Sequence, residues 1–350
     1  MPVAAVGREV KGHDHQVALA GPDFPVATGA EVRLGGLIRL DAADLHLAHP
    51  KTAQSTRARH TARAANTKTT SVRSVTCLRK GLKPTASVSS LPMETIRLDR
   101  SDGIVTITLD RPEKKNAINA AMWDELLETF RAIADNDEDR VVVITGAGGA
   151  FCSGADLSGA SPTGRSTHQL AAMRHVGDVC IALHRIPQPT IAKVGGVAAG
   201  AGMNLALGCD LIVASDDARF SEIFARRGLT IDFGGSWLLP RLIGMHKAKE
   251  LALFADIISA QEAVEFGIVN RVVPATDLDK FVDDWAHRLT AGPPIALAQT
   301  KRLLNNSFGV TLEQALEDEG WAQTVNFSTA DTLEAMTAFV EKRDPRFSGR

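Results

Sequence analysis

The sequence predicts an α/β fold in which helices cover a mostly parallel sheet and a helical region ends the chain. Three observations support this prediction. A pair of strand patterns follows Met93, strand and helix patterns then alternate, and amphipathic helices dominate beyond about residue 245. Strands that alternate with helices normally form a parallel sheet, because each helix carries the chain back to the edge where the previous strand began.

The first element is a hairpin in the stretch ETIRLDRSDGIVTITLDRP, where two strands of alternating polarity flank Ser101-Asp102-Gly103. An Asp-Gly pair between such strands favours a tight turn. A helix is expected from about Asn119, and its apolar face carries Met122, Leu126, Phe130 and Ile133. Spacings of three and four residues place these side chains on one side of a helix.

The following patterns give the rest of the α/β part. The β-branched run RVVVITG at 140–146 is typical of a buried strand. A helix is expected at 168–184, and it is followed by the strand TIAKV, a second glycine loop with a short helix, and the strand LIVAS. The later helices MHKAKELALFA, TLEQALEDEGWAQTV and DTLEAMTAFVEKR are amphipathic, and we expect them to pack on the core or on a neighbouring subunit.

The first 92 residues are expected to lie outside the folded part. Residues 45–92 contain no Asp or Glu but nine Lys or Arg, and they lack regularly spaced apolar residues. The leader is interpreted as a disordered segment, as an organellar transit peptide, or as the result of a misassigned start with the true start at Met93. We favour the misassigned start, which implies a cytoplasmic protein, whereas a genuine transit peptide implies the mitochondrial matrix.

Composition excludes several classes of function. Residues 93–350 carry 26 Lys and Arg against 35 Asp and Glu, a formal charge of −9, which argues against a nucleic-acid surface. No apolar run approaches the length that spans a membrane, so no membrane partner is expected. Cys77, Cys152, Cys180 and Cys209 form no C-x-x-C pair and are expected to be reduced intracellular thiols.

Two glycine loops, CSGAD and GGVAAGAG, each follow a buried strand pattern. The first does not fit a dinucleotide-binding fingerprint, because Phe151 stands where the third glycine is needed. Small residues let the main chain approach a ligand closely, and two converging N–H groups form an oxyanion hole. The alternative is that these glycines only permit tight packing of a helix on a strand.

Titratable residues supply candidates for chemistry. Asp232 is a lone acid in the apolar stretch GLTIDFGGSWLLPRL, where an ionised carboxylate costs free energy unless it is paired or used. It is interpreted either as a catalytic base or as the N-cap of the following helix. Glu222 is a reserve acid that we expect at the surface or in an ion pair, and Cys152 is expected to be a buried thiol. His175, His184 and His246 lack metal-ligand spacing, so no metal is expected.

Five motifs resemble the crotonase, or enoyl-CoA hydratase/isomerase, superfamily. They are LDRPEKKNAIN, ITGAGGAFCSGADL, AKVGGVAAGAGMNLALGCDL, GLTIDFGGSWLLPRLIG and AFVEKRDPRF. The resemblance covers residues 93–350 and implies a crotonase-like ββα spiral core at 93–290 with a C-terminal helical trimerisation region at 291–350. It also implies an acyl-CoA thioester substrate, no cofactor apart from the coenzyme A of that substrate, and a homotrimer or dimer of trimers.

The resemblance also assigns roles to residues. The backbone N–H groups of Ala155 and Ala201 would form the oxyanion hole, although the family usually has glycine at the second position. Phe339 and Lys342 would meet the nucleotide from an adjacent subunit. Residues that would bind coenzyme A and the substrate are Lys115, Ala117, Ser153, Gly154, Asp156, Leu157 and Gly200. The charges of Lys114 and Lys115 are equally compatible with ordinary solvent-exposed side chains.

Departures from the family pattern favour one reaction. Family hydratases use two glutamates, and the matching positions here hold Asn204 and Phe224, which cannot exchange a proton. Asp232 matches the catalytic aspartate of family isomerases, including the ring-1,2-epoxyphenylacetyl-CoA isomerases. The sequence therefore predicts an acyl-CoA double-bond isomerase, with an enoyl-CoA hydratase and a non-catalytic acyl-CoA-binding protein as alternatives. The acyl group depends on the loop at 158–169, which has no diagnostic residue.

Overall fold

The computed structural model describes residues 93–158 and 168–350, which fall within one unit of the chain, Arg79–Arg350. The predictions for the leader at 1–92, including Cys77, and for loop residues 159–167 lie outside the described residues. In the described part, no helix combines the length and the apolar character that a membrane span requires.

The main sheet has six strands in the order β1-β2-β3-β4-β6-β9, and all neighbours are parallel except the β1–β2 pair. The β1–β2 hairpin confirms the first prediction, because Asp102 and Gly103 both have positive φ, 52° and 77°, as a tight hairpin turn requires. The strands are β1 Ile96–Ser101, β2 Ile104–Leu109, β3 Val141–Gly146, β4 Thr190–Val194, β6 Leu211–Ser215 and β9 Arg271–Val273.

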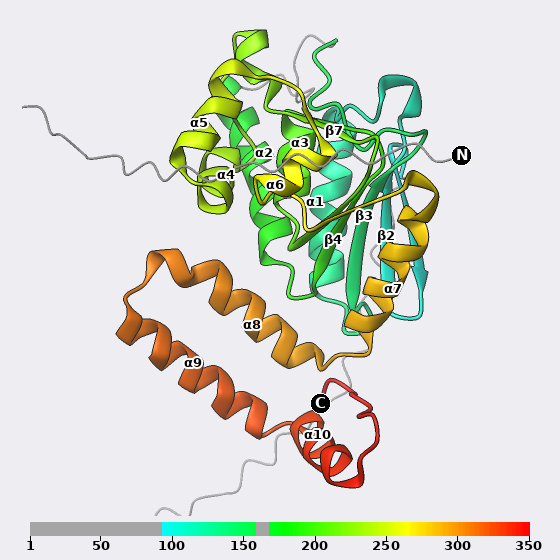
Figure 1. Ribbon diagram of the computed structural model, residues 1–350, viewed down its shortest axis with the longest axis vertical. Helices are drawn as coiled ribbons and strands as arrows, with labels where there is room; N and C mark the ends of the chain where they lie inside the picture. The colour runs from blue at the N-terminus through cyan, green and yellow to red at the C-terminus, as the bar shows by residue number, and fades with distance from the viewer. Residues whose placement is uncertain (1–92, 159–167) are drawn as a thin grey trace, which may run out of the picture. The chain divides into compact units, whose positions relative to one another are not determined.

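Helices cover both faces of this sheet (Figure 1). On one face, Val142 and Ile144 of β3 belong to the core that includes α1 Ala120–Ala134 and α2 Gln169–Arg185. On the other, Val141 and Val143 pack with α7 Leu278–Thr290. Successive strand side chains point to opposite faces, so a strand buried on both sides is a continuous apolar run, as predicted.

A second sheet of three short strands, in the order β5-β7-β8, was not predicted. Its strands are β5 Val197–Ala199, β7 Arg219–Ser221 and β8 Ile258–Ser259. Strands of two or three residues are too short to show an alternating pattern, and the same holds for β9 of the main sheet. The second sheet matters for function because β5 lies inside the second glycine loop.

The remaining elements are mostly helical, as predicted beyond residue 245. Lys301 anchors α8 Pro294–Asn306, because its ammonium group lies 2.7 Å from the Asp210 carboxylate and donates to the Gln188 carbonyl. The other helices are α3 Ala201–Leu207, α4 Gly235–Ile243, α5 Met245–Phe254, α6 Ala260–Glu265, α9 Leu312–Phe327 and α10 Ala330–Glu341. Short 3-10 helices are η1 Pro112–Lys114, η2 Ile223–Arg227, η3 Ala275–Asp277 and η4 Ser307–Gly309.

The last two helices leave much of their apolar surface uncovered in this single chain. Helix α9 buries only Ala322 among its residues, although its sequence predicts an amphipathic helix. Large exposed apolar patches on such helices commonly mark an interaction surface. The exposed apolar side chains of α9 and α10 are Leu312, Leu316, Trp321, Val325, Phe327, Leu333, Met336, Phe339 and Val340.

The start of α1 gives a direct test of the sequence-based boundary. Asn119 caps the helix, and its side chain accepts a hydrogen bond of 2.9 Å from the Met122 N–H. We expect Asn119→Ala to lower the free energy of unfolding by about 1 kcal/mol, measured by denaturant titration, because one N–H of the first turn loses its acceptor. Asn119→Asp should retain most of the stability, and an equal loss in both variants would contradict the capping role.

Candidate active site

Three segments that are distant in sequence lie side by side at the carboxyl ends of β3 and β4. Ile118 forms a parallel bridge with Ala155, in which the Ile118 N–H donates to the Gly154 carbonyl at 2.8 Å. Cys152 forms a second parallel bridge with Ala198 of β5. The structure thus brings together the predicted residues Lys115, Ala117, Ser153, Gly154, Ala155, Asp156, Gly200 and Ala201, whereas the roles of these residues remain predictions.

The first segment is shaped by Asn116, which is fully buried. Its side chain accepts from the Arg111 N–H at 3.0 Å and donates to the carbonyls of Ala147 and Ala150, both at 2.8 Å. These bonds hold Asn116 and Lys115 in the left-handed region, with φ of 56° and 50°. Lys115 leaves its side chain exposed, and its carbonyl accepts from the Ser153 N–H.

The two predicted oxyanion donors have free N–H groups. Neither the Ala155 N–H nor the Ala201 N–H donates a hydrogen bond to another described residue. Ala201 is the first residue of α3, where helical N–H groups have no partner within the helix. A Cβ added at Gly154 would lie 2.9 Å from the Ala199 carbonyl oxygen and 3.7 Å from the Ala201 nitrogen, so the two loops touch. This arrangement suits the binding of a single carbonyl oxygen.

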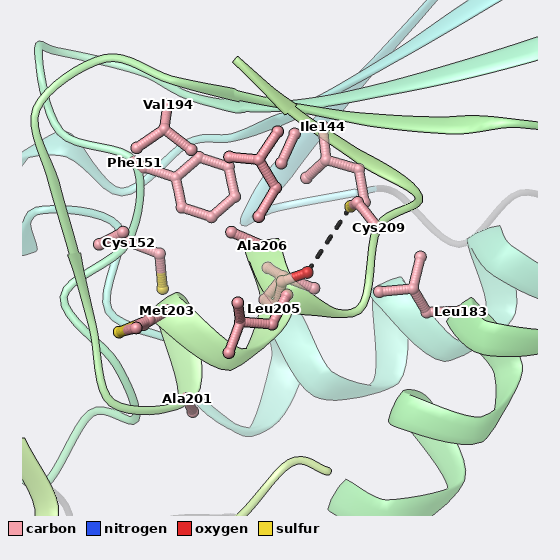
Figure 2. Close-up of a cluster of buried hydrophobic side chains, with 14 of the residues drawn as sticks. Ile144, Phe151, Cys152, Leu183, Val194, Ala201, Met203, Leu205, Ala206 and Cys209 are labelled. Carbon is pink, nitrogen blue, oxygen red and sulfur yellow. Dashed lines mark hydrogen bonds between the residues drawn. The ribbon is translucent and has the colours of Figure 1, made fainter. Parts of the chain in front are cut away.

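At Gly202, next to the second predicted donor, the glycine serves close packing, as the alternative interpretation of the glycine loops proposed. A Cβ at Gly202 would lie 2.3 Å from the Cys152 carbonyl oxygen and 2.7 Å from its sulfur, so α3 reaches this close only with glycine there. Cys152 itself lies in the buried cluster around α3 together with Met203 (Figure 2). Burial raises the pKa of the Cys152 thiol to about 12, which confirms the prediction of a buried thiol.

Asp156 is held by protein groups. Its carboxylate accepts two hydrogen bonds from Ser158 and forms an ion pair with Arg111 at 2.9 Å, and these contacts lower the pKa of Asp156 to about 2. Arg111 also donates to the Ala117 carbonyl at 2.6 Å, so it ties the first segment to the second. Sequence reasoning missed Arg111, whose only signal is its place in the motif LDRPEKKNAIN. Leu157, the next residue, is half exposed.

Asp232 lies just before α4, but it does not cap that helix. The N-cap is Gly234, and no side chain accepts a hydrogen bond there, so the capping interpretation is wrong. The Asp232 Oδ1 atom is buried and has no hydrogen-bond partner among the described residues, while the residue as a whole is partly exposed. Desolvation raises the pKa of Asp232 to about 6. An unpaired carboxylate with a pKa near neutrality is suited to accept a proton.

The two positions matched to the hydratase glutamates are both buried, at α3 and at η2. Asn204 is fully buried on α3 and donates from its side-chain nitrogen to the Asp232 carbonyl oxygen at 3.0 Å. Phe224 is also buried, and a Cβ at Gly200 would lie 3.7 Å from its ring. An amide and an aromatic ring therefore occupy the space beside the second donor loop, and neither can exchange a proton.

Glu222 was expected at the surface or in an ion pair, and this prediction is wrong. Its exposure is 1%, and no ion pair with a described residue is present. One carboxyl oxygen accepts from the Asn204 side chain at 3.4 Å, and the other has no partner among the described residues. Desolvation, together with the smaller effect of the Asp232 charge, raises the pKa of Glu222 to about 8, although the hydrogen bond from Asn204 opposes this rise. Local sequence gave no signal, because the Glu222 side chain is buried against residues distant in the chain, among them Asn204 of α3.

Other predicted positions lie apart from these loops. Phe339 is 85% exposed near the end of α10, and Lys342 follows that helix, so the single chain does not join them to the site. The structural interpretation of the histidines agrees with the contacts of His175, which pairs with Asp124 at 2.8 Å, and of His184, which packs edge-on against Trp237. No cluster of metal-ligating side chains occurs within residues 93–158 and 168–350.

Contact between the two donor loops can be tested with paired glycine variants. Gly154 and Gly149 both have positive φ, 102° and 77°, but only the Cβ at Gly154 would meet main chain, whereas that at Gly149 meets nothing within 4 Å. We expect Gly154→Ala to lower the free energy of unfolding by about 1–3 kcal/mol more than Gly149→Ala, because the two loops must separate. Denaturant titration of both variants checks this, and equal losses would refute the close approach.

The sequence of the chain is similar to a known protein family and to individual members of it. The enoyl-CoA hydratase/isomerase family profile matches residues 99–350. The chain is 40% identical over 256 residues to a probable enoyl-CoA hydratase of Rhodobacter capsulatus, covering 73% of this chain and 98% of that protein. It is 36% identical over 261 residues to the 1,2-epoxyphenylacetyl-CoA isomerase of Escherichia coli, covering 74% of this chain and all of that protein.

Solved structures show the same relationship. The crystal structure of an enoyl-CoA hydratase from Bacillus anthracis superposes with a TM-score of 0.70 at 34% identity, over 73% of this chain and all of that one. An enoyl-CoA hydratase structure from Streptomyces coelicolor gives 0.72 at 34% identity, over 77% of this chain and all of that one. These similarities confirm the predicted crotonase-like fold with its helical C-terminal region. The chain therefore belongs to the enoyl-CoA hydratase/isomerase family, within the crotonase superfamily.

Proposed function

We propose that the protein is an acyl-CoA double-bond isomerase of the enoyl-CoA isomerase type. The observation that carries the proposal is the buried Oδ1 atom of Asp232, which has no hydrogen-bond partner among the described residues, while the two hydratase positions hold Asn204 and Phe224. Moving a double bond needs one group that removes a proton and returns it elsewhere, whereas adding water needs an acid and a base. The similarity to the Escherichia coli epoxyphenylacetyl-CoA isomerase also supports the isomerase class.

In the proposed reaction, Asp232 removes a proton from C2 of a 3-enoyl thioester. The electrons of the broken C–H bond move onto the thioester oxygen, giving a conjugated enolate, and the N–H groups of Ala155 and Ala201 donate to that oxygen. Asp232 then returns the proton to C4, so the double bond ends between C2 and C3 and no atom is gained or lost. A single oxyanion donor typically contributes about 3 kcal/mol to such a transition state.

We also propose where coenzyme A binds and how the subunits assemble. Coenzyme A would run along Lys115, Ala117, Ser153, Gly154, Asp156, Leu157 and Gly200, using mainly backbone groups at Asp156 because its carboxylate is engaged with Arg111 and Ser158. We propose a homotrimer or dimer of trimers in the cytoplasm. The exposed apolar residues of α9 and α10 support such assembly, in which Phe339 and Lys342 would reach the nucleotide of a neighbouring subunit.

An enoyl-CoA hydratase is the second candidate. The relatives from Rhodobacter capsulatus and Bacillus anthracis are named as hydratases, and the buried Glu222 is an acid that sequence comparison with hydratases does not reveal. In this alternative, water would add across a 2-enoyl thioester with Asp232 and Glu222 as the proton-exchanging pair. The two reactions differ in substrate, which makes them separable.

The test follows the ultraviolet absorbance of the conjugated thioester. Purified protein is given a 3-enoyl-CoA and, separately, a trans-2-enoyl-CoA. Absorbance gained from the first substrate supports isomerisation, and absorbance lost from the second supports hydration. Coenzyme A binding without either change would support a non-catalytic family member and would refute the proposal.

Asp232 has a specific expected effect on turnover. We expect Asp232→Asn to lower kcat for 3-enoyl-CoA by at least about 100-fold, because the amide cannot accept a proton. Asp99→Asn changes an exposed aspartate on β1 in the same way and should leave kcat within about twofold. Steady-state kinetics of both variants decide the point, and unchanged kcat in Asp232→Asn would remove this residue from the mechanism.

The pH dependence of kcat/KM at acid pH tests the protonation of Asp232. Burial raises the pKa of Asp232 to about 6, so a base at this position is protonated below pH 6 and active above it. We expect kcat/KM for 3-enoyl-CoA to fall about tenfold per pH unit below pH 6 and to level off above it. A profile whose acid limb lies near pH 4, the range of an exposed carboxyl, would contradict the desolvated base.

A further inference from the structure

The space around Asp232 contains more unpaired oxygen atoms than one base requires. Asn204 Oδ1, Glu222 Oε1 and Asp232 Oδ1 are each buried without a hydrogen-bond partner among the described residues. The three residues are neighbours, because the Asn204 side-chain nitrogen donates both to Glu222 Oε2 at 3.4 Å and to the Asp232 main-chain carbonyl at 3.0 Å, and because the Asp232 charge acts on the Glu222 carboxyl group. Buried acceptors without donors are rare in folded proteins and call for an explanation.

The charges around this cluster make the shortage of donors more severe. Neither Glu222 nor Asp232 has an ion pair in the described part of the chain, and Arg226 of η2 is paired with Asp256 at the surface. From α2, the titratable group facing Asp232 is the Cys180 thiol, whose pKa burial raises to about 11, so it stays neutral. From α3, the facing group is the neutral Asn204. Two ionised carboxylates here would have no compensating charge among the described residues, which disfavours the doubly ionised state.

Protonation of one carboxyl group leaves a single negative charge in the cluster, and the more buried of the two groups is the one that binds the proton. Glu222 is almost completely buried, whereas Asp232 is partly exposed, so the penalty for a charge is larger at Glu222. The directions of the shifts agree, because desolvation raises the pKa of Glu222 to about 8 and that of Asp232 only to about 6. A neutral Glu222 beside an ionised Asp232 is the arrangement in which two carboxyl groups take different roles.

We propose that Glu222 is a positioning residue, held as a neutral carboxylic acid that acts through Asn204 to fix the Asp232 segment and leaves Asp232 as the one negative charge beside the substrate. This inference rests on the proposed isomerase function. Its proton removes the second negative charge from the cluster, and its Oε2 orients the amide that holds the Asp232 main chain. An ionised Glu222 would add a second charge near the enolate and disfavour that intermediate.

A consequence is that activity falls on the alkaline side when Glu222 loses its proton. Wild-type kcat/KM for 3-enoyl-CoA should decline above about pH 8, in addition to its acid limb. Glu222→Gln keeps a neutral hydrogen-bonding group of the same length, so its profile should stay level to at least about pH 9.5. Glu222→Ala leaves the Asn204 amide without this partner and should lose at least about tenfold in kcat at pH 7, most of which Glu222→Gln restores.

Glu265→Gln, at an exposed position of α6, is the matched control and should keep the wild-type alkaline limb. A second measurement needs no substrate and uses wild-type protein. Infrared difference spectroscopy between pH 7 and pH 9.5 should show the carbonyl band of one buried protonated carboxyl disappearing, and this change should be absent in Glu222→Gln. An alkaline limb that persists in Glu222→Gln, or a wild-type spectrum without this band, would overturn the inference.

These outcomes are distinct from failure of the proposed function. Wild-type protein that does not convert 3-enoyl-CoA refutes isomerisation, whatever the infrared result. Wild-type protein that does convert it, but whose alkaline limb is unchanged in Glu222→Gln, refutes only the role of Glu222. A Glu222→Gln variant that loses as much activity at pH 7 as Asp232→Asn would also overturn the positioning role, because it would mean that Glu222 exchanges protons itself.

Discussion

The site depends on the contact between the two glycine loops. Gly154 lies so close to the Ala199 carbonyl oxygen that a Cβ would not fit without movement. This closeness brings together two loops whose Ala155 and Ala201 N–H groups donate to no other described residue. Donors fixed by the main chain need no reorganisation when charge develops on a bound carbonyl oxygen. The cost is borne by glycine, which alone adopts such backbone conformations freely.

The main sheet creates the conditions for this contact. β3 and β4 are parallel neighbours, so their carboxyl ends lie at the same edge and the loops that follow them must emerge together. The faces of the sheet are covered by α7 on one side and by α1 and α2 on the other, which leaves the edge as the place where backbone is free to meet a ligand (Figure 1). The short strand β5 then returns the second loop to Cys152.

Electrostatics give the site its chemical character. Three carboxyl groups of the site differ in surroundings: Asp156 is held by Ser158 and Arg111, whereas Asp232 and Glu222 are desolvated and form no ion pair with a described residue. Aspartate is therefore held in an ion pair at position 156, whereas at position 232 its buried oxygen has no partner among the described residues. Desolvation, together with the absence of compensating charge in the described residues, separates the pKa values of Asp232 and Glu222.

Sequence alone determined the elements whose signals are local. The Asp-Gly turn, the cap and apolar face of α1, the buried run of β3 and both donor loops follow from neighbouring residues. It also singled out Asp232, because an acid in a glycine-rich apolar stretch is visible without a structure. Tertiary structure decided the rest: β5, β7, β8 and β9 exist only through pairing, and the burial of Glu222 beside Asn204 of α3 appears only in the folded chain. Such burial depends on residues far apart in the chain, which no local pattern records.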